Sequence, residues 1–308
     1  MKIAVQMDNI ADIDLNGDST YMLLLEAQKR GYEIHYYTVD KLTLRLDGVF
    51  AETQILQLQQ GMEDFYKLDK AQETNLATMD VILVRQDPPF NMNYITSTYI
   101  LEHLPEQVKI VNNPASLRNY SEKLFIFDFP EFITPTIITD DKAQIEKFRQ
   151  QYENIIIKPL YACGGDGIFF VSKTDKNFNI IIDSLKTIYQ TPLMVQSYIK
   201  NAERGDKRII LINGKAVGAV LRVPPAGDVR ANMHIGGKAV QTSLTSHEEY
   251  MCKKIGAKLK ELGLYFVGID VIEGYLTEIN VTSPTGIQRI NKLNNVSLEA
   301  IFWDELFD

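Results

Sequence analysis

Hydrophobic residues in the first third of the chain form short apolar runs that alternate with helical patterns. Ile3 to Met7 and Val81 to Arg85 are apolar runs of strand length. Asp18-Ser19-Thr20 offers N-cap chemistry for a helix expected over residues 19 to 30, and Gly31 ends that helix. Further elements are expected as strands over 33–39 and 109–112, a hairpin turn at Asp47-Gly48 and a helix over 94–104. This alternation predicts a parallel sheet with a substrate site at the carboxyl ends of its strands.

The rest of the chain reads mainly as hairpins. Strands are expected over 154–159, 168–172 and 193–199, and two more over 207–212 and 215–223. Asn213-Gly214 joins the last two, and a tight turn there sets Arg208 roughly opposite Ala219. A long polar loop is expected over 224–240, and loops of this length are usually functional or disordered. The chain is therefore predicted to be of the α/β class, with two or three lobes.

The segment VGIDVIEGYLTEINVTSPTG predicts a hairpin that carries a metal site. With its turn at Glu273-Gly274, Ile269 faces Ile279 and Asp270 faces Glu278. Asn280 then lies on the same polar face, and a register shifted by one would bury Asp270 among aliphatic residues. Two carboxylates and an amide oxygen suit Mg²⁺. Because Mg²⁺ in proteins is normally coordinated by substrate phosphates as well as by protein oxygens, ATP is the first partner expected. The alternative is a solvent-exposed hairpin edge with ordinary acidic residues.

Three other segments carry candidate binding chemistry. Lys158 ends a strand before the loop YACGGDG, whose glycines leave backbone N–H groups free to surround phosphate oxygens; a ligand-free hairpin is the alternative. Ser283-Pro284-Thr285-Gly286 offers hydroxyls and amides for a small carboxylate. Arg85 ends a strand where it can clamp a substrate carboxylate, although a stiff surface turn is also compatible.

Composition narrows the classes of function. The formal net charge of -8 disfavours nucleic acid as a partner, and no apolar window approaches the length needed to cross a membrane. Cys163 and Cys252 give neither a disulfide framework nor a metal-ligand spacing. The chain opens directly as a strand without a signal peptide, so a reducing cytoplasm is expected. With no Ser-His-Asp or Cys-His arrangement, catalysis is expected to depend on phosphate and metal.

The segment DVI-EGYLTEINVTSPTGI resembles the signature of bacterial glutathione synthetases, a family of ATP-grasp ligases. Four further stretches resemble the same family in the same order: R-x-D-P-P-F from Arg85, N-x-P-x-S-L-R-x-x-x-E-K-L up to Leu124, G-D-K-R-I-I-L-I-N-G-K and G-x-x-R-x-N. The resemblance implies an N-terminal parallel-sheet domain (1–122), followed by an ATP-grasp module of two α+β lobes (123–200 and 201–308). Asn113-Pro114 is expected to open a helix that contains Lys123, and the resemblance places this lysine at the entry to that module, where it reaches the nucleotide phosphates.

Site residues implied by the resemblance, taken with the chemistry above, fall into four groups. Nucleotide is bound by Lys123, Lys158, Gly164, Gly165, Gly167, the hinge Gln196, Ser197, Tyr198 and Ile199, and Asp206. The catalytic arginines are Arg208, Arg222 and Arg230, and Arg230 lies in a lid with Gly236-Gly237 as a hinge. The substrates are bound by Arg85, Asn232, Ser283 and Thr285. The metal is bound by Asp270, Glu278 and Asn280. Departures from the family pattern are Gln86, Lys238 and the loop from Tyr161 to Asp166.

The implied activity is ligation of γ-glutamylcysteine to glycine with ATP, through an acyl phosphate. Two Mg²⁺ ions, or Mn²⁺ in their place, and a homotetramer are also implied. The alternatives are another ATP-grasp ligase that joins a carboxylate to an amine, or a nucleotide-binding protein without activity. No thiol is needed for such a reaction, so Cys163 is not expected to act as a nucleophile.

Overall fold

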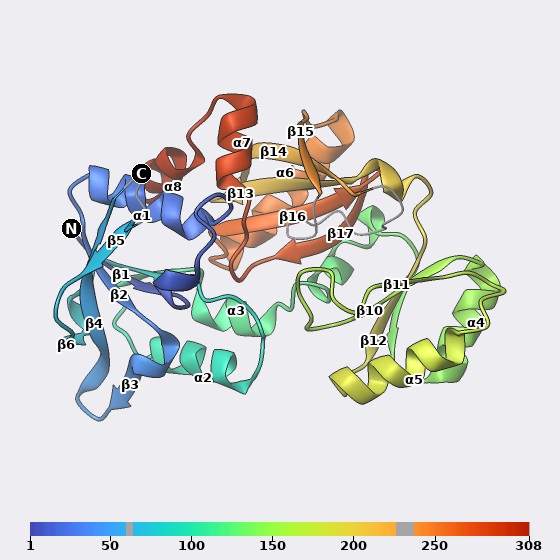
Figure 1. Cartoon of the computed structure of the whole chain (residues 1–308), viewed down its shortest axis with the longest axis horizontal. Coiled ribbons are helices and arrows are strands. Elements are labelled where there is room, and N and C mark those ends of the chain that lie inside the picture. The colour runs from blue at the N-terminus through green and yellow to red at the C-terminus, as the bar shows by residue number, and fades with distance from the viewer. Residues whose placement is uncertain (60–63, 226–236, 308) are drawn as a thin grey trace.

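The computed structural model describes residues 1–59, 64–225 and 237–307, and its strands form three sheets that follow one another along the chain (Figure 1). The first sheet is N-terminal and mixed. Its strands are β1 (Lys2–Gln6), β2 (Glu33–Tyr37), β3 (Leu42–Arg45), β4 (Gly48–Leu58), β5 (Tyr66–Leu68), β6 (Gln72–Asn75), β7 (Val81–Val84) and β8 (Lys109–Val111). Strands β2, β1, β7 and β8 are parallel neighbours, which confirms the predicted parallel core. Strands β3 to β6 add an antiparallel arm. The chain reverses between β3 and β4 at Leu46-Asp47, one residue before the predicted turn, because Gly48 already pairs with Arg45.

Three helices belong to this first region: α1 (Ser19–Lys29), α2 (Met92–Leu101) and α3 (Pro114–Asn119). The Asp18 side chain accepts a hydrogen bond from Tyr21 N at 2.7 Å and caps α1, as predicted. Helix α3 ends at Asn119, so the prediction that Lys123 lies inside this helix was wrong. Asn119, Tyr120 and Ser121 are weak helix formers, and Tyr120 leaves the helix with φ −114° and ψ 85°. Lys123 therefore lies in the turn that follows.

The second sheet is four-stranded and antiparallel, in the order β11-β10-β12-β9. Its elements are β9 (Thr136–Thr139), α4 (Lys142–Tyr152), β10 (Ile155–Pro159), β11 (Phe169–Val171), α5 (Phe178–Tyr189) and β12 (Leu193–Ser197). Ile145 and Phe148 of α4 and Ile182 of α5 pack on Ile155 and Ile157 in a core separate from the rest of the protein. This sheet carries the glycine-rich loop between β10 and β11.

The third sheet is five-stranded and antiparallel, in the order β15-β14-β13-β16-β17. Its strands are β13 (Asp206–Ile212), β14 (Lys215–Val223), β15 (Lys238–Gln241), β16 (Phe266–Ile272) and β17 (Tyr275–Asn280). The helices are α6 (Ser246–Glu261), α7 (Ile287–Asn294) and α8 (Leu298–Phe307). Ile209 and Leu211 join the core that contains α6, whereas Ile210 and Ile212 join the core that contains α7 and α8. The sheet is therefore a buried layer between helices, because alternate residues of a strand point to opposite faces.

Glycine allows α6 to approach the turn between β13 and β14 closely. A Cβ atom on Gly256 would lie 1.9 Å from the backbone oxygen of Gly214, so no larger residue fits there without moving one of the two elements.

The hairpin of β16 and β17 has the predicted register from Gly268 to Asp270, but a bulge beyond Asp270 shifts it by one residue, so that Val271 faces Leu276 and Ile272 faces Tyr275. Ile269 faces Ile279 and Asp270 faces Glu278, and the turn residues Glu273 and Gly274 have positive φ. The prediction that Arg208 faces Ala219 was wrong: Arg208 faces Val220, because a bulge between Ile210 and Leu211 shifts the register. The predicted loop 224–240 also ends earlier than expected, since β15 begins at Lys238 and pairs with β14.

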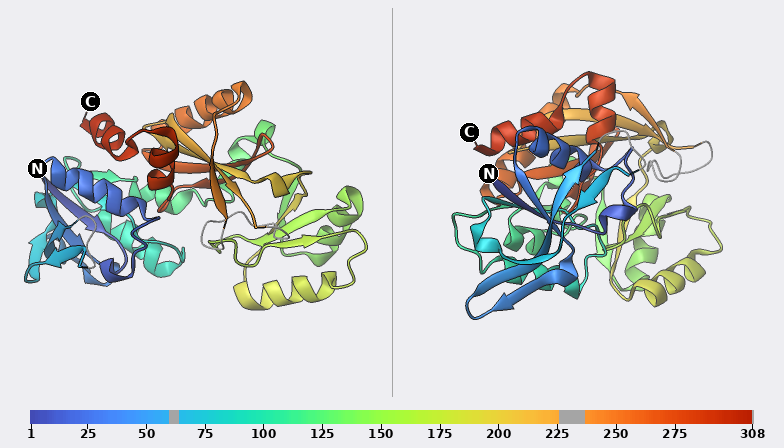
Figure 2. Two further views of the ribbon diagram at one scale, coloured as in Figure 1. Left: turned by 45° about the horizontal axis from the view of Figure 1, so that its top comes forward. Right: turned by 60° about the vertical axis from the view of Figure 1, so that its left-hand side comes forward.

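The C-terminal helix returns to the N-terminal region. Trp303 of α8 is fully buried and donates its indole N–H to the backbone oxygen of Leu23 in α1 at 2.8 Å. Both ends of the chain lie on the same side of the molecule in each view (Figure 2). Of the helices in the described part of the chain, none has both the length and the apolar character needed to cross a membrane.

Candidate active site

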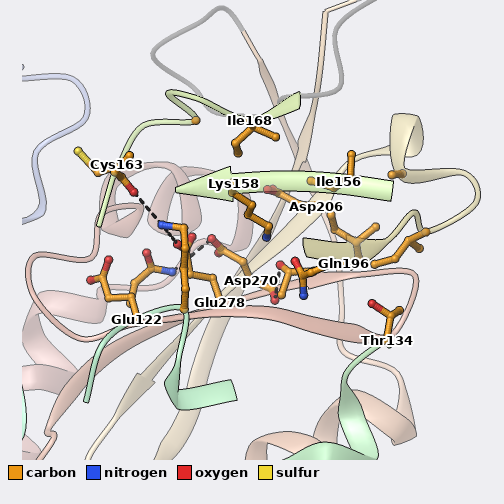
Figure 3. A pocket seen from close by; sticks show the side chains of 18 of the residues that line it. Glu122, Thr134, Ile156, Lys158, Cys163, Ile168, Gln196, Asp206, Asp270 and Glu278 are labelled. Atoms are coloured by element: carbon orange, nitrogen blue, oxygen red, sulfur yellow. Dashed lines mark hydrogen bonds and ion pairs between the residues drawn. The ribbon is translucent and has the colours of Figure 1, made fainter. Parts of the chain in front are cut away.

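A cavity lies between the four-stranded and the five-stranded sheets (Figure 3). Every residue predicted to bind nucleotide, except Gly167, lines it: Lys123, Lys158, Gly164, Gly165, Gln196, Ser197, Tyr198, Ile199 and Asp206. Gly167 lies at the base of the loop, where a Cβ atom would come within 2.7 Å of the Pro159 ring. The three predicted metal ligands line the same cavity. Segments far apart in the sequence therefore meet around one space.

Asp270, Glu278 and Asn280 present oxygen donors on neighbouring strands. Asp270 is buried, and Asn280 Nδ2 lies 3.2 Å from Asp270 Oδ2. No three His, Cys, Asp or Glu side chains within residues 1–59, 64–225 and 237–307 are grouped to hold a metal ion. A cation here would use two carboxylates and the Asn280 amide oxygen, and would complete its shell with water or phosphate oxygens. This donor set fits Mg²⁺.

Two buried arginines are paired with the carboxylates of this cavity. Arg208 Nη2 donates to Asp270 Oδ2 at 2.9 Å, and Arg222 Nη2 lies 3.0 Å from the same oxygen. Arg222 also donates to Asp206 Oδ2 at 2.7 Å. Burial by itself raises the pKa of Asp270, but Arg208 and Arg222 outweigh burial and hold this pKa below its ordinary value. Asp270 is therefore an anion with no proton to lose before it can bind a cation.

The two lysines of the cavity differ in their partners. Lys123 Nζ lies 2.9 Å from Glu278 Oε1 and donates to the backbone oxygen of Ala162 at 2.7 Å. Burial lowers the pKa of Lys123, but Glu278 outweighs burial and raises it. For Lys158, burial dominates and lowers the pKa to about 8. Lys158 is thus a cation whose charge depends on pH near neutrality.

The hinge segment has a fixed side-chain amide. Thr136 Oγ1 donates to the backbone oxygen of Thr134 at 2.8 Å and accepts from Gln196 Nε2 at 3.1 Å. The Thr136 hydroxyl donates its only proton to the backbone oxygen of Thr134, so it can only accept from Gln196. The amide nitrogen of Gln196 must therefore face Thr136. The side-chain oxygen of Gln196 is then the end that can serve a ligand. The N–H groups of Ser197 and Tyr198 are already bonded to Pro135 and Asn154.

A second cavity adjoins the first at the loop that follows β17. The predicted substrate-binding residues Ser283 and Thr285 line it, together with Arg208 and Arg222. Residues shared by both cavities are Glu122, Cys163, Gly164, Arg208 and Asn280. The two cavities are therefore continuous at these shared residues.

Arg85 does not line either cavity. It is buried, donates to Thr20 Oγ1 at 3.0 Å and donates to the backbone oxygen of Pro284 at 3.0 Å. Arg85 thus anchors the loop of Ser283 and Thr285 to the N-terminal region, and a direct contact with substrate stays a prediction. The neighbouring Gln86 is also buried and accepts from Gln6 Nε2 at 2.6 Å.

Arg230, Asn232 and Gly236, which were predicted to belong to a lid, lie outside the described residues. Among the residues lining the two cavities, five charged side chains were not predicted as site residues: Asp14, Asp87, Glu122, Asp166 and Arg289. Glu122 lies in the E-K-L stretch and Asp87 in the D-P-P-F stretch that carried the family resemblance, so both could have been predicted as site residues from the sequence. Burial and the charge of Glu278 raise the pKa of Glu122.

Two family models together match most of the chain. The prokaryotic glutathione synthetase N-terminal domain matches residues 1–118, and the prokaryotic glutathione synthetase ATP-grasp domain matches residues 122–295. Among similar curated proteins are glutathione synthetases of Rhodopseudomonas palustris (47% identical), Mesorhizobium japonicum (45%) and Vibrio vulnificus (40%). Each alignment covers 99% of this chain and 97% of the relative.

Solved structures of low sequence identity share the fold. The D-cycloserine synthetase DcsG has a TM-score of 0.70 at 11% identity, with 100% of both chains covered. The ATP-grasp ligase PsnB, solved with a minimal precursor, Mg and ADP, has a TM-score of 0.61 at 14% identity and covers 99% of this chain and 97% of its own. The predicted class, an N-terminal α/β domain followed by an ATP-grasp module, is confirmed.

Proposed function

Because the chain belongs to the prokaryotic glutathione synthetase family and is an ATP-dependent ligase, we propose that it joins γ-glutamylcysteine to glycine. The cysteinyl carboxylate attacks the γ-phosphorus of ATP, the bond to ADP breaks, and an acyl phosphate forms. The amine of glycine then attacks the acyl carbon, phosphate leaves, and the amide bond of glutathione forms. One observation carries this proposal: lysines, arginines and oxygen ligands converge on a cavity that opens into a second one at a loop of hydroxyls and amides.

We assign each residue of the cavity a role in this reaction from its charge and its position. Lys123 and Lys158 attract the phosphates of ATP, and Gly164 and Gly165 let the backbone approach them. Arg208 and Arg222 stabilise the negative charge of the transferring phosphoryl group and of the tetrahedral intermediate. Asp270, Glu278 and Asn280 would hold divalent cations, which would offset negative charge on the transferring phosphoryl group. We propose two Mg²⁺ ions, with Mn²⁺ as a substitute.

The base of the nucleotide is proposed to bind at the hinge. Gln196 Oε1 accepts a hydrogen bond from the amino group of adenine, because its amide nitrogen is held by Thr136. Guanine presents an oxygen at that position, so GTP is expected to be a poor substrate.

A coupled assay of ADP release tests the proposed reaction. With γ-glutamylcysteine, glycine and Mg²⁺ we expect ADP and glutathione in equal amounts, and little ADP when γ-glutamylcysteine is omitted. ADP formed only with another carboxylate or amine indicates a different ligase. No ADP with any of these substrates, despite nucleotide binding, contradicts catalysis.

We further propose that residues 1–122, 123–200 and 201–308 form three folding units and that the protein works as a homotetramer in the cytoplasm. Both cysteines are free thiols, which fits a reducing compartment. Light scattering during size-exclusion chromatography measures the assembly, and a mass other than four chains contradicts the tetramer. Limited proteolysis with mass spectrometry tests the proposed boundaries, which predict cuts near residues 122 and 200.

Nucleotide affinity is expected to depend on the protonation of Lys158. Its pKa of about 8 means that the free protein carries this cation below pH 8 and loses it above. Bound phosphate favours the charged form, so binding above pH 8 takes up a proton and the Kd of a non-hydrolysable ATP analogue rises. The rise approaches about tenfold per pH unit, since a pKa difference of one unit is worth about 1.4 kcal/mol. Calorimetry in buffers of different ionisation enthalpy measures both quantities. In Lys158→Met the affinity falls and this pH dependence disappears; a dependence that persists assigns it to another group.

Cys163 is expected to be dispensable for catalysis. Burial and the charge of Glu122 raise the pKa of its thiol, the opposite of what a nucleophilic thiolate needs. Cys163→Ser therefore keeps most of the activity, whereas alkylation inhibits by crowding the phosphate loop, and ATP protects against it. Cys252 is buried and serves as the slowly labelled internal control. An inactive Cys163→Ser protein that binds ATP normally gives the thiol a chemical role.

A further inference from the structure

Glu122 stands where the two cavities meet. It lines the nucleotide cavity, the cavity beside Ser283 and Thr285, and the small apolar cavity between Phe90 and Leu160. Figure 3 shows Glu122 near Cys163, at the opposite end of the nucleotide cavity from Thr134. It is therefore remote from the hinge and close to the place where a substrate in the second cavity meets the phosphates.

One oxygen of this carboxylate is fully engaged with the chain after β17. Glu122 Oε1 accepts from Val281 N at 3.2 Å, from Thr282 N at 3.3 Å and from Thr282 Oγ1 at 2.8 Å. The backbone oxygen of Glu122 also accepts from Ile279 N at 3.0 Å. These bonds fix the side chain, so the position of the second oxygen is fixed as well. Within the part of the chain that the structure describes, no hydrogen bond is made to Glu122 Oε2.

The charges around Glu122 determine what can approach its second oxygen. Glu278 adds negative charge, and the Lys123 ammonium is held by Glu278 and Ala162. A substrate carboxylate or a phosphate would be repelled at Oε2, whereas the N–H groups of an amine would be attracted. The ligand expected there is a hydrogen-bond donor with positive or developing positive charge.

We propose that Glu122 Oε2 accepts a hydrogen bond from the amine of the incoming amino acid and so directs its lone pair at the acyl carbon. This proposal rests on the proposed function. Ser283 and Thr285 are expected to hold the carboxylate of that amino acid. They lie one and three residues after Thr282, whose hydroxyl donates to Glu122. An α-amino acid carries its amine and its carboxylate on one carbon. Two binding groups that lie close together in the protein, Glu122 for the amine and the loop of Ser283 and Thr285 for the carboxylate, therefore suit its short span. The amine of the glutamyl group lies at the far end of the dipeptide from the reacting carboxylate and does not compete for the junction.

Glu122→Gln distinguishes binding of the amine by Oε2 from the structural hydrogen bonds that Oε1 accepts from Val281 and Thr282. Glutamine keeps one oxygen that can accept from Val281, Thr282 and the Thr282 hydroxyl, but it replaces Oε2 by an amide nitrogen that donates. We expect the KM for glycine to rise about tenfold or more, with the KM values for ATP and γ-glutamylcysteine within about twofold of the wild type. Trapping with hydroxylamine should still yield hydroxamate at the wild-type rate, because the acyl phosphate forms before the amine is needed. Glu73→Gln, an exposed charge removal in β6, is the matched control and keeps all three KM values.

Glu122→Asp provides the opposite comparison. It keeps a carboxylate but withdraws it by one methylene, so it weakens the bonds to Val281 and Thr282 more than glutamine does. If Oε2 serves the amine, the KM for glycine rises more in Glu122→Gln than in Glu122→Asp. The reverse order, or a loss of hydroxamate in Glu122→Gln, shows that Glu122 only supports the chain and overturns the proposal. A wild-type protein that makes no glutathione contradicts the proposed function itself, and the two failures are distinguishable.

Discussion

Replacing Glu278 by alanine is expected to abolish ligation while the protein remains folded. Glu278 supplies one of the two carboxylates proposed to hold the divalent cation, and it is the ion-pair partner of Lys123 at 2.9 Å. Its loss removes a proposed metal ligand and the ion-pair partner of Lys123, which is proposed to bind the phosphates of ATP. Several kcal/mol of transition-state stabilisation are at stake, so kcat should fall by about a thousandfold or more. Asn280→Ala is expected to act in the same direction.

Steady-state assays over a range of Mg²⁺ concentrations, with circular dichroism for the fold, test this expectation. The Glu278 side chain is partly exposed, so stability should fall by only about 2 kcal/mol. Glu52→Ala, which removes a surface carboxylate paired with Lys41, is the control and should retain full activity. Substantial turnover of Glu278→Ala at saturating Mg²⁺ would remove this residue from the metal site.

Among the substitutions proposed for this protein, Asn112→Ala is expected to lower the free energy of unfolding most. Asn112 is buried, and its Nδ2 donates to the backbone oxygens of Phe266 at 2.9 Å and Val281 at 2.7 Å. Its Oδ1 accepts from Phe266 N at 2.8 Å. Alanine leaves three buried backbone groups without partners, at a cost of about 1–3 kcal/mol for each group, and we expect about 4 kcal/mol in total. Activity should fall too, because Val281 precedes the loop of Ser283 and Thr285.

Denaturant unfolding followed by tryptophan fluorescence measures this loss, since Trp303 is buried in the helix that returns to α1. Asn93→Ala, at an exposed position of α2, is the matched control and should change stability by less than about 0.5 kcal/mol. Unfolding curves of Asn112→Ala that coincide with the wild type would mean that water or a rearranged side chain satisfies these backbone groups.

Local sequence signals predicted the parallel core strands and the pairing of Ile269 with Ile279 and of Asp270 with Glu278, but not the short strands β5, β6, β9 and β15. The register of β16 and β17 follows from the need to keep Ile269 and Ile279 buried while Asp270 and Glu278 share the other face. The bulges in β14 and β17 were not predictable in this way, because one extra residue in a strand leaves the turn of its hairpin unchanged. The end of α3 was missed for a related reason: the family stretch runs through Lys123 without a break, whereas the helix stops at Asn119.

The partners of the site residues were beyond the reach of sequence patterns. Arg208 and Asp270 are 62 residues apart, and Arg85 bonds to the backbone of Pro284 at a separation of 199 residues. Residue chemistry indicated a substrate carboxylate as the partner of Arg85 and an anionic transition state as the partner of Arg208. Which oxygen each one binds depends on how three sheets are placed in space, and a single sequence does not encode that in any local period.

The ion pairs of the cavity have a consequence for the order in which ATP and its cation bind. Asp270 is neutralised by Arg208 and Arg222, and Glu278 by Lys123. A cation alone must break these pairs and leave the basic groups unmatched, and a nucleotide alone must leave the carboxylates unmatched. When both arrive, each charge exchanges one partner for another, so each ligand should raise the affinity for the other by the same factor. The cavity therefore favours loading by the preformed metal–nucleotide complex over stepwise filling.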